Sequence, residues 1–292
     1  MTDLGVLAAA LTPRGKRGDL DFGAAFELTD LLCAARVRGI VWFAPAGEYP
    51  AFGLEERTRL LYLAAKRSRV PLYAGVGAVS LDDSLYLARE ALSAGVEDLV
   101  VPPPHFYQYR QEEIREFYLQ FAAQLPSRTA ARIYISNTPS VTSAIDPATA
   151  EDLLATGRFA GIEDVRRPLT ASQQTWLATD EGTIVSARCE GAHGIISAAA
   201  SAAPELVCAL DTALRCGDRD EAVRLDAMLR EFHGWMSQFA QPVVLKVAAE
   251  LRGIKVGMLP VPVSPERLRV LDEFRAWFRN WLPMVKKLSA NA

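Results

Sequence analysis

Residues 5–11, GVLAAAL, are the first of eight short apolar runs that decide the fold of this chain. Each run is almost continuously apolar instead of alternating with polar residues, and this pattern is typical of parallel strands that are covered on both faces. We therefore expect a parallel β-sheet. The seven other expected strands are residues 39–45, 71–77, 98–104, 131–137, 159–165, 183–187 and 194–199.

Amphipathic stretches with helix signals separate most of these runs. Ser80 and Asp146 stand where helix N-caps are expected, and Pro147 follows at a first helical position. Strand and helix alternation of this kind predicts an α/β fold, and eight units in about 215 residues fit a TIM (β/α)8 barrel. A doubly wound sheet is the alternative, but residues 12–15, TPRG, lack its glycine-rich fingerprint.

Two features modify the expected barrel. Only residues 188–193 separate the last two expected strands, whereas a parallel crossover normally needs about a dozen residues, so we expect a shortened seventh βα connection. After Gly217 the strands cease, and residues 218–239, 242–251 and 264–288 have helical patterns. The sequence thus predicts a barrel domain over residues 1–217 and a C-terminal helical domain over residues 218–292.

Composition argues against several classes of protein. The chain has 292 residues, 50% hydrophobic residues and a net charge of −3, so it lacks the basic excess of a nucleic-acid-binding protein. No apolar run approaches the roughly 18 residues of a membrane span, and the first residues do not resemble a signal peptide. The four cysteines are far apart and fit no metal or disulfide motif. We expect a cytoplasmic protein without nucleic-acid or membrane partners.

Several motifs together resemble the dihydrodipicolinate synthase / N-acetylneuraminate lyase family. They occur in family order along nearly the whole chain: residues 5–13 (GVLAAALTP), 47–48 (GE), 137–140 (NTPS), 194–197 (GIIS) and 245–246 (LK). The resemblance implies a TIM barrel with a C-terminal helical bundle, assembled as a homo-oligomer, either a dimer or a tetramer of two dimers. It also implies class I aldolase chemistry, in which a lysine on the sixth strand forms a Schiff base with an α-keto acid.

The residues at the family's catalytic positions differ from that pattern. Glu163 stands in place of the Schiff-base lysine, and Ser136 replaces the proton-relaying tyrosine of the fifth strand. The loop that holds the keto-acid carboxylate has lost both threonines, the cross-dimer tyrosine position falls on Phe106 beside Tyr107, and the recruiting arginine is Val141. In this sequence the loop reads Pro45, Ala46, Gly47 and Glu48.

These departures lead us to expect a pseudoenzyme, because glutamate cannot form an imine and no lysine lies between residues 67 and 245. The expected protein is a catalytically altered or inactive homologue that keeps a pocket for a small carboxylate or keto acid. The alternative is a lyase, dehydratase or hydrolase that acts on a small carbonyl compound or hydroxy acid with Glu163 as general acid/base. A metal-assisted aldolase using His105, Glu48, Glu163 and Asp164 ranks last, because no metal-ligand spacing supports it. We expect no metal and no cofactor.

Glu163 itself has three interpretations. It could pair with Arg188 or Arg166 and plug the old site, act as a general acid/base, or remain a solvated carboxylate at the rim. The expected pocket residues are Pro45, Ala46, Gly47, Glu48, His105, Phe106, Tyr107, Val141, Arg188 and Ile196.

Overall fold

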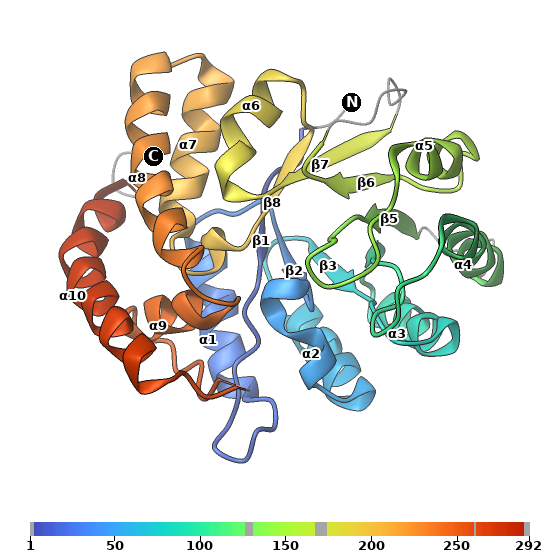
Figure 1. Cartoon of the computed structure of the whole chain (residues 1–292), viewed down its shortest axis with the longest axis horizontal. Coiled ribbons are helices and arrows are strands. Elements are labelled where there is room, and N and C mark those ends of the chain that lie inside the picture. Colours follow the sequence, from blue (N-terminus) through green and yellow to red (C-terminus); the bar gives the residue numbers. More distant parts are fainter. Residues whose placement is uncertain (1–2, 126–130, 167–173, 260, 289–292) are drawn as a thin grey trace.

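Eight short parallel strands, each of four or five residues, pair in chain order and close into a barrel (Figure 1). The computed structural model describes residues 3–125, 131–166, 174–259 and 261–288. The predicted TIM barrel is therefore confirmed. The strands are β1 (Gly5–Ala9), β2 (Gly39–Trp42), β3 (Leu72–Gly75), β4 (Asp98–Val101), β5 (Arg132–Ser136), β6 (Gly161–Asp164), β7 (Thr175–Thr179) and β8 (Gly194–Ser197).

Helices surround the barrel. Of the two predicted N-cap residues, Ser80 caps its helix with its side chain, whereas Asp146 precedes the helix Pro147–Ala155 without a side-chain cap hydrogen bond. The Ser80 hydroxyl accepts a hydrogen bond from the amide of Asp83 at 3.1 Å, which satisfies one of the free amides of a helix start. The helices are α1 (Phe22–Ala34), α2 (Leu54–Arg67), α3 (Leu81–Ser93), α4 (Gln111–Gln124), α5 (Pro147–Ala155), α6 (Ile184–Cys189), α7 (Pro204–Cys216), α8 (Arg219–Met236), α9 (Val243–Leu251) and α10 (Pro265–Leu288).

The position of the seventh strand was predicted wrongly. Of residues 183–187, Thr183 ends a 3-10 turn and the rest belong to helix α6. The strand is formed by Thr175–Thr179, which pairs with both β6 and β8. The expected six-residue connection at 188–193 followed from this error. Residues 180–193 separate β7 from β8, and they leave room for a helix of six residues.

Close packing between β6 and β7 requires a glycine at the start of β6. A Cβ atom on Gly161 would lie 2.0 Å from the carbonyl oxygen of Thr175, so no other residue fits without moving β7. Two residues further along the same strand, Glu163 faces the barrel interior in register with Ser136 and Leu177.

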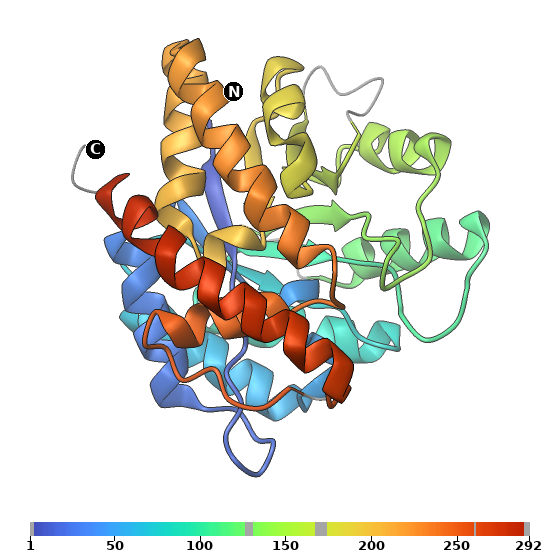
Figure 2. The ribbon, with the colours of Figure 1, turned by 60° about the vertical axis from the view of Figure 1, so that its left-hand side comes forward.

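The C-terminal helices pack against one side of the barrel, next to α7 and α1 (Figures 1 and 2). Helices α8 and α10 meet through an aromatic cluster, in which the ring centroid of Phe232 lies 5.4 Å from that of Trp281 and 5.8 Å from that of Phe278. The boundary predicted at residue 217 coincides with the end of α7, where Gly217 adopts a φ of 74°. Within the described residues, every helix is too short or too polar to span a membrane.

Candidate active site

A cavity of about 280 Å³ opens at the end of the barrel where the strands terminate. The carboxyl ends of TIM-barrel strands are where active sites of this fold lie. The cavity is lined by Ala9, Ala44, Pro45, Ala46, Asn137, Thr138, Pro139, Ser140, Glu163, Val165, Thr179, Asp180, Glu181, Ile196, Ala198, His233 and Gln241.

Glu163, which lines this cavity, is hydrogen-bonded to the neighbouring Ser136 of β5. The Ser136 hydroxyl donates a hydrogen bond to Oε2 of Glu163 at 2.6 Å, and both side chains are buried. Thr179, at the end of β7, donates a second hydrogen bond to the same carboxyl group. No lysine or arginine forms an ion pair with Glu163 in the part of the chain that the structure describes. The interpretation of Glu163 as one half of a Glu–Arg plug is therefore not supported.

Burial raises the pKa of Glu163 to about 7. Removal of the carboxylate from water disfavours its charged form, while the hydrogen bonds from Ser136 and Thr179 favour that form and the negative charge of Asp164 opposes it. A carboxyl group with a pKa near 7 exchanges protons at neutral pH, as a general acid/base must.

A second group of polar side chains lies at the end of β7. Asp180 and Glu181 come directly after the strand, and His233 reaches them from α8. The Nε2 atom of His233 is 3.7 Å from Oδ1 of Asp180. Glu181 is buried, and its Oε1 accepts hydrogen bonds from the Ser197 hydroxyl and the Ala199 amide.

The loop after β2 is fixed by a buried ion pair. Glu48 pairs with Lys246 of α9, and both side chains are almost completely buried. Burial lowers the pKa of Lys246, and the hydrogen bond and charge of Glu48 counteract that change. Pro45 and Ala46 of the same loop line the cavity, as predicted, whereas Gly47 and Glu48 do not.

His105 lies beside the loop and outside the cavity. Its Nδ1 is 3.5 Å from the hydroxyl of Tyr49, and Arg57 packs over the Tyr49 ring. Burial lowers the pKa of His105, and the nearby positive charge of Arg57 lowers it further. The Arg57 guanidinium donates hydrogen bonds to the carbonyl oxygens of Gly75 and Gly77. These contacts indicate that His105, Tyr49 and Arg57 form a structural cluster next to the loop after β2, outside the cavity.

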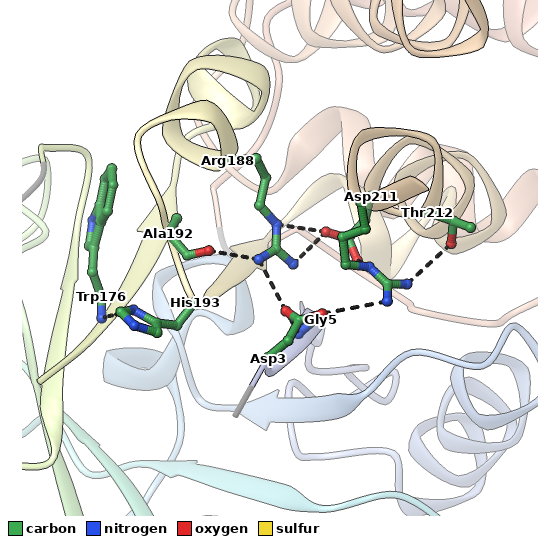
Figure 3. A network of polar contacts seen from close by, with 9 residues as sticks. Asp3, Gly5, Trp176, Arg188, Ala192, His193, Asp211 and Thr212 are labelled. Carbon is green, nitrogen blue, oxygen red and sulfur yellow. Dashed lines mark hydrogen bonds and ion pairs between the residues drawn. The ribbon is translucent and has the colours of Figure 1, made fainter. Parts of the chain in front are cut away.

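Arg188 was expected next to Glu163, and this expectation is wrong. Because residues 184–189 form helix α6, the Arg188 side chain faces α7, where its Nε donates a hydrogen bond to Asp211 at 2.7 Å (Figure 3). Asp3 and the carbonyl oxygen of Ala192 accept from the same guanidinium group. Arg188 is therefore not a pocket residue.

The remaining predicted pocket residues fall into two groups. Ile196 lines the cavity. Phe106, Tyr107 and Val141 are exposed at the surface and lie outside the cavity lining. The first two have exposed fractions of 80% and 65%, which leaves them available to another molecule.

Sequence analysis missed Asp180, Glu181 and His233. The run TWLAT at residues 175–179 is rich in β-branched and aromatic residues and could have identified β7, which would have placed Asp180 and Glu181 at the mouth. His233 has no such local signal, because only the packing of α8 across the barrel brings it to the cavity.

Comparison with known proteins identifies relatives along nearly the whole chain. The model of the dihydrodipicolinate synthetase family matches residues 3–279. A 4-hydroxy-tetrahydrodipicolinate synthase from Gluconacetobacter diazotrophicus is 27% identical over 92% of this chain and 95% of its own. One of the same name from Xanthomonas axonopodis pv. citri is 28% identical over 93% of each chain.

Solved structures show the same fold. The dihydrodipicolinate synthase from Aquifex aeolicus matches with a TM-score of 0.84 and 22% identity, over 97% of this chain and 98% of that one. The dihydrodipicolinate synthase from Agrobacterium tumefaciens str. C58 has a TM-score of 0.85 and 24% identity, and the match covers 97% and 98% of the two chains.

These relatives contradict the predicted function. A catalytically altered or inactive homologue was expected from the residues at the family's catalytic positions, with a lyase, dehydratase or hydrolase as alternative. The curated relatives that span the chain are named as synthases instead, and no feature of the structure shows the protein to be inactive. Glu163 on β6 is therefore a difference between this site and the family's catalytic pattern. It is not evidence that the protein is a pseudoenzyme.

Proposed function

Since the chain belongs to the dihydrodipicolinate synthetase family, we propose that it is an active synthase-type enzyme whose catalytic centre is the cavity at the mouth of the barrel. Its substrate is a small 2-oxo acid. The observation that carries this proposal is the buried carboxyl group of Glu163, which lines the cavity and has a pKa of about 7.

Glu163 is the group that moves the proton. In its ionised form it takes a proton from the carbon next to the substrate carbonyl. The electron pair of that C–H bond forms a C=C bond, and the π electron pair of the carbonyl moves to its oxygen to give an enolate. The hydroxyls of Ser136 and Thr179 hold the carboxylate in position. The enolate carbon then attacks the carbonyl carbon of a second compound, and the resulting alkoxide takes the proton back from the Glu163 carboxyl group. This step forms the new bond of a synthase reaction.

The lining of the cavity supports a small polar substrate. The buried hydroxyl of Thr138 lines the cavity and has no hydrogen-bond partner among the described residues. An unpaired buried hydroxyl is unfavourable unless a ligand or water occupies it. A carbonyl or carboxylate oxygen of the substrate is the acceptor that this hydroxyl lacks.

Amine catalysis through Lys246 is the second candidate, since the family resemblance implies Schiff-base chemistry on a lysine. Burial lowers the pKa of Lys246, and an amine with a lowered pKa is the nucleophile that Schiff-base formation requires. Against this candidate, Lys246 pairs with Glu48, and none of the six lysines of the chain lines the cavity.

Deuterium exchange tests the proposal without knowledge of the second substrate. The full-length protein is incubated in D2O with a panel of 2-oxo acids that begins with pyruvate, and loss of the signal of the protons next to the carbonyl is followed by NMR. We expect exchange with at least one acid, with a rate that rises with pH through about 7 because Glu163 must be ionised. Glu163→Gln should lower the rate by about 100-fold or more.

A control variant and a trapping reaction separate the two candidates. Glu190→Gln changes an exposed carboxylate that does not line the cavity, and it should leave the exchange rate unchanged. Borohydride added with the 2-oxo acid should leave every lysine unmodified. A covalent adduct on Lys246 would establish the second candidate instead, and the absence of exchange with all acids would overturn the proposal.

We also propose that the protein is a cytoplasmic homo-oligomer. Exposed Phe106 and Tyr107 beside the mouth support self-association, since exposed aromatic residues are typical of protein interfaces. One solved relative is described as the first monomeric dihydrodipicolinate synthase variant, and that wording treats a monomer as the exception among these proteins. The four free cysteines of the described chain support a reducing compartment.

A further inference from the structure

We propose that Asp180, Glu181 and His233 bind one divalent transition-metal ion, Mn²⁺ or Zn²⁺, at the rim of the cavity. One ligand atom from each residue lies within 4.8 Å of the other two. Two ligand atoms on a metal with bonds of about 2.0–2.2 Å are roughly 3–3.5 Å apart. The 3.7 Å between Nε2 of His233 and Oδ1 of Asp180 already approaches this separation, so small side-chain rotations would close the site.

Glu181 provides an independent reason to expect a cation. Its exposed fraction is 5%, and it forms no ion pair with any lysine or arginine that the structure describes. The hydrogen bonds from Ser197 at 3.0 Å and Ala199 at 2.9 Å both go to Oε1, so the described residues provide no hydrogen-bond partner for Oε2. Buried carboxylates are normally paired with a cation or coordinate a metal.

The two other ligands are positioned for the same task. Oδ1 of Asp180 accepts a hydrogen bond from the Gly182 amide at 2.9 Å, which orients the carboxylate. A Cβ atom on Gly182 would lie 3.3 Å from Cε1 of His233, so the glycine allows the imidazole to approach closely. Hydrogen bonds that orient metal-binding side chains are a regular feature of metal sites.

The three ligand atoms determine which ion the site prefers, and the coordination positions that they leave open determine its role. Two carboxylates with one imidazole suit Mn²⁺ and Zn²⁺ better than Mg²⁺ or Ca²⁺, which prefer oxygen ligands alone. Three protein ligands leave positions open for a substrate atom. All three residues line the cavity that Glu163 also lines, so the bound ion would polarise a substrate carbonyl oxygen while Glu163 accepts the proton. That catalytic role rests on the proposed function, whereas metal binding does not.

Calorimetric titration of the chelator-treated, full-length protein with MnCl2, ZnCl2 and MgCl2 tests the site in the absence of any 2-oxo acid. We expect one equivalent of Mn²⁺ or Zn²⁺ to bind, with weaker or undetectable binding of Mg²⁺. Asp180→Asn and His233→Gln should each weaken the binding by about ten-fold or more, because each removes a ligand.

Glu231→Gln is the matched control, because it changes an exposed carboxylate on the same helix, α8, outside the cluster. Its affinity for the ion should equal that of the unmodified chain, and circular dichroism confirms that all three variants are folded. Absence of binding of both Mn²⁺ and Zn²⁺ overturns the proposal. So does an affinity of the Asp180 and His233 variants that equals the affinity of the unmodified chain. Since no substrate is present, failure here is distinguishable from failure of the deuterium exchange.

Discussion

A single buried carboxyl group, Glu163, makes the stability of this protein depend on pH. Its pKa rises from 4.5 to about 7 on folding, so the folded state holds the proton more tightly than the unfolded state. The resulting stabilisation is fully present below pH 4.5 and is lost as the pH rises through about 7. A shift of this size corresponds to roughly 3 kcal/mol, and part of the fall in the free energy of unfolding between pH 5 and 8 should come from Glu163.

Urea denaturation at several pH values checks this prediction. Glu163→Gln, which is neutral at every pH, should flatten the decline and be more stable than the unmodified chain at pH 8. Glu190→Gln should retain the original pH dependence, because its carboxylate is exposed in the folded protein. If the free energy of unfolding changed with pH by the same amount in Glu163→Gln and in the unmodified chain, Glu163 would not change its pKa on folding.

At the scale of single residues, the sequence analysis identified some residues of the candidate site and missed others. Glu163 and Ser136 were identified because both stand at positions that the family resemblance assigns to catalytic residues on the fifth and sixth strands. Their mutual hydrogen bond was not predicted, since it depends on the register between β5 and β6. His233 could not be identified from its surroundings in the sequence, because its role follows only from the packing of a distant helix.

At the scale of elements, the Arg188–Asp211 ion pair joins α6, in the connection between β7 and β8, to α7. The side chains of Arg188 and Asp211 have exposed fractions of 8% and 3%. Arg188→Met should lower the free energy of unfolding by about 2 kcal/mol, because it removes the buried partner of Asp211 and leaves that carboxylate paired only with the more exposed Arg215. Arg224→Met removes the exposed pair with Glu221 and should change this free energy by less than about 1 kcal/mol. Equal losses in the two variants, measured by urea denaturation, would refute this assignment.

The error in the seventh strand has a physical cause. Residues 183–187, TIVSA, form a short apolar run with β-branched residues, and periodicity alone cannot distinguish such a run from a buried helical segment. The remaining seven strands were placed correctly, because clear helix signals between them fixed the alternation. The error moved Arg188 toward the cavity and kept Asp180 and Glu181 out of the expected site.

At the scale of the whole molecule, residues on both sides of the division predicted at residue 217 contribute to the proposed active site. His233 and Gln241 line the cavity from the C-terminal part of the chain, and Lys246 fixes the loop after β2 through Glu48. The proposed active site is therefore built by both parts of the chain. The domain boundary itself remains a prediction from the sequence.

Self-association is the prediction that concerns the molecule as a whole. The rings of Phe106 and Tyr107 stack edge to face with centroids 4.8 Å apart, and they project from the loop after β4. We expect the protein to sediment as a species at least twice the 31.9 kDa of one chain. Replacing both residues, as Phe106→Ser with Tyr107→Ser, should shift it toward the mass of a single chain, because the interface loses its two aromatic contacts.

Val223→Ser is the control, because Val223 has an exposed fraction of 71% and lies on α8, distant in sequence from the aromatic pair. Sedimentation velocity at several protein concentrations should give the same oligomer for this variant and the unmodified chain. An unmodified chain that sediments at 31.9 kDa throughout would refute self-association. An oligomer that persists in the double variant would place the interface on another surface, and Phe106 and Tyr107 would then need a different partner.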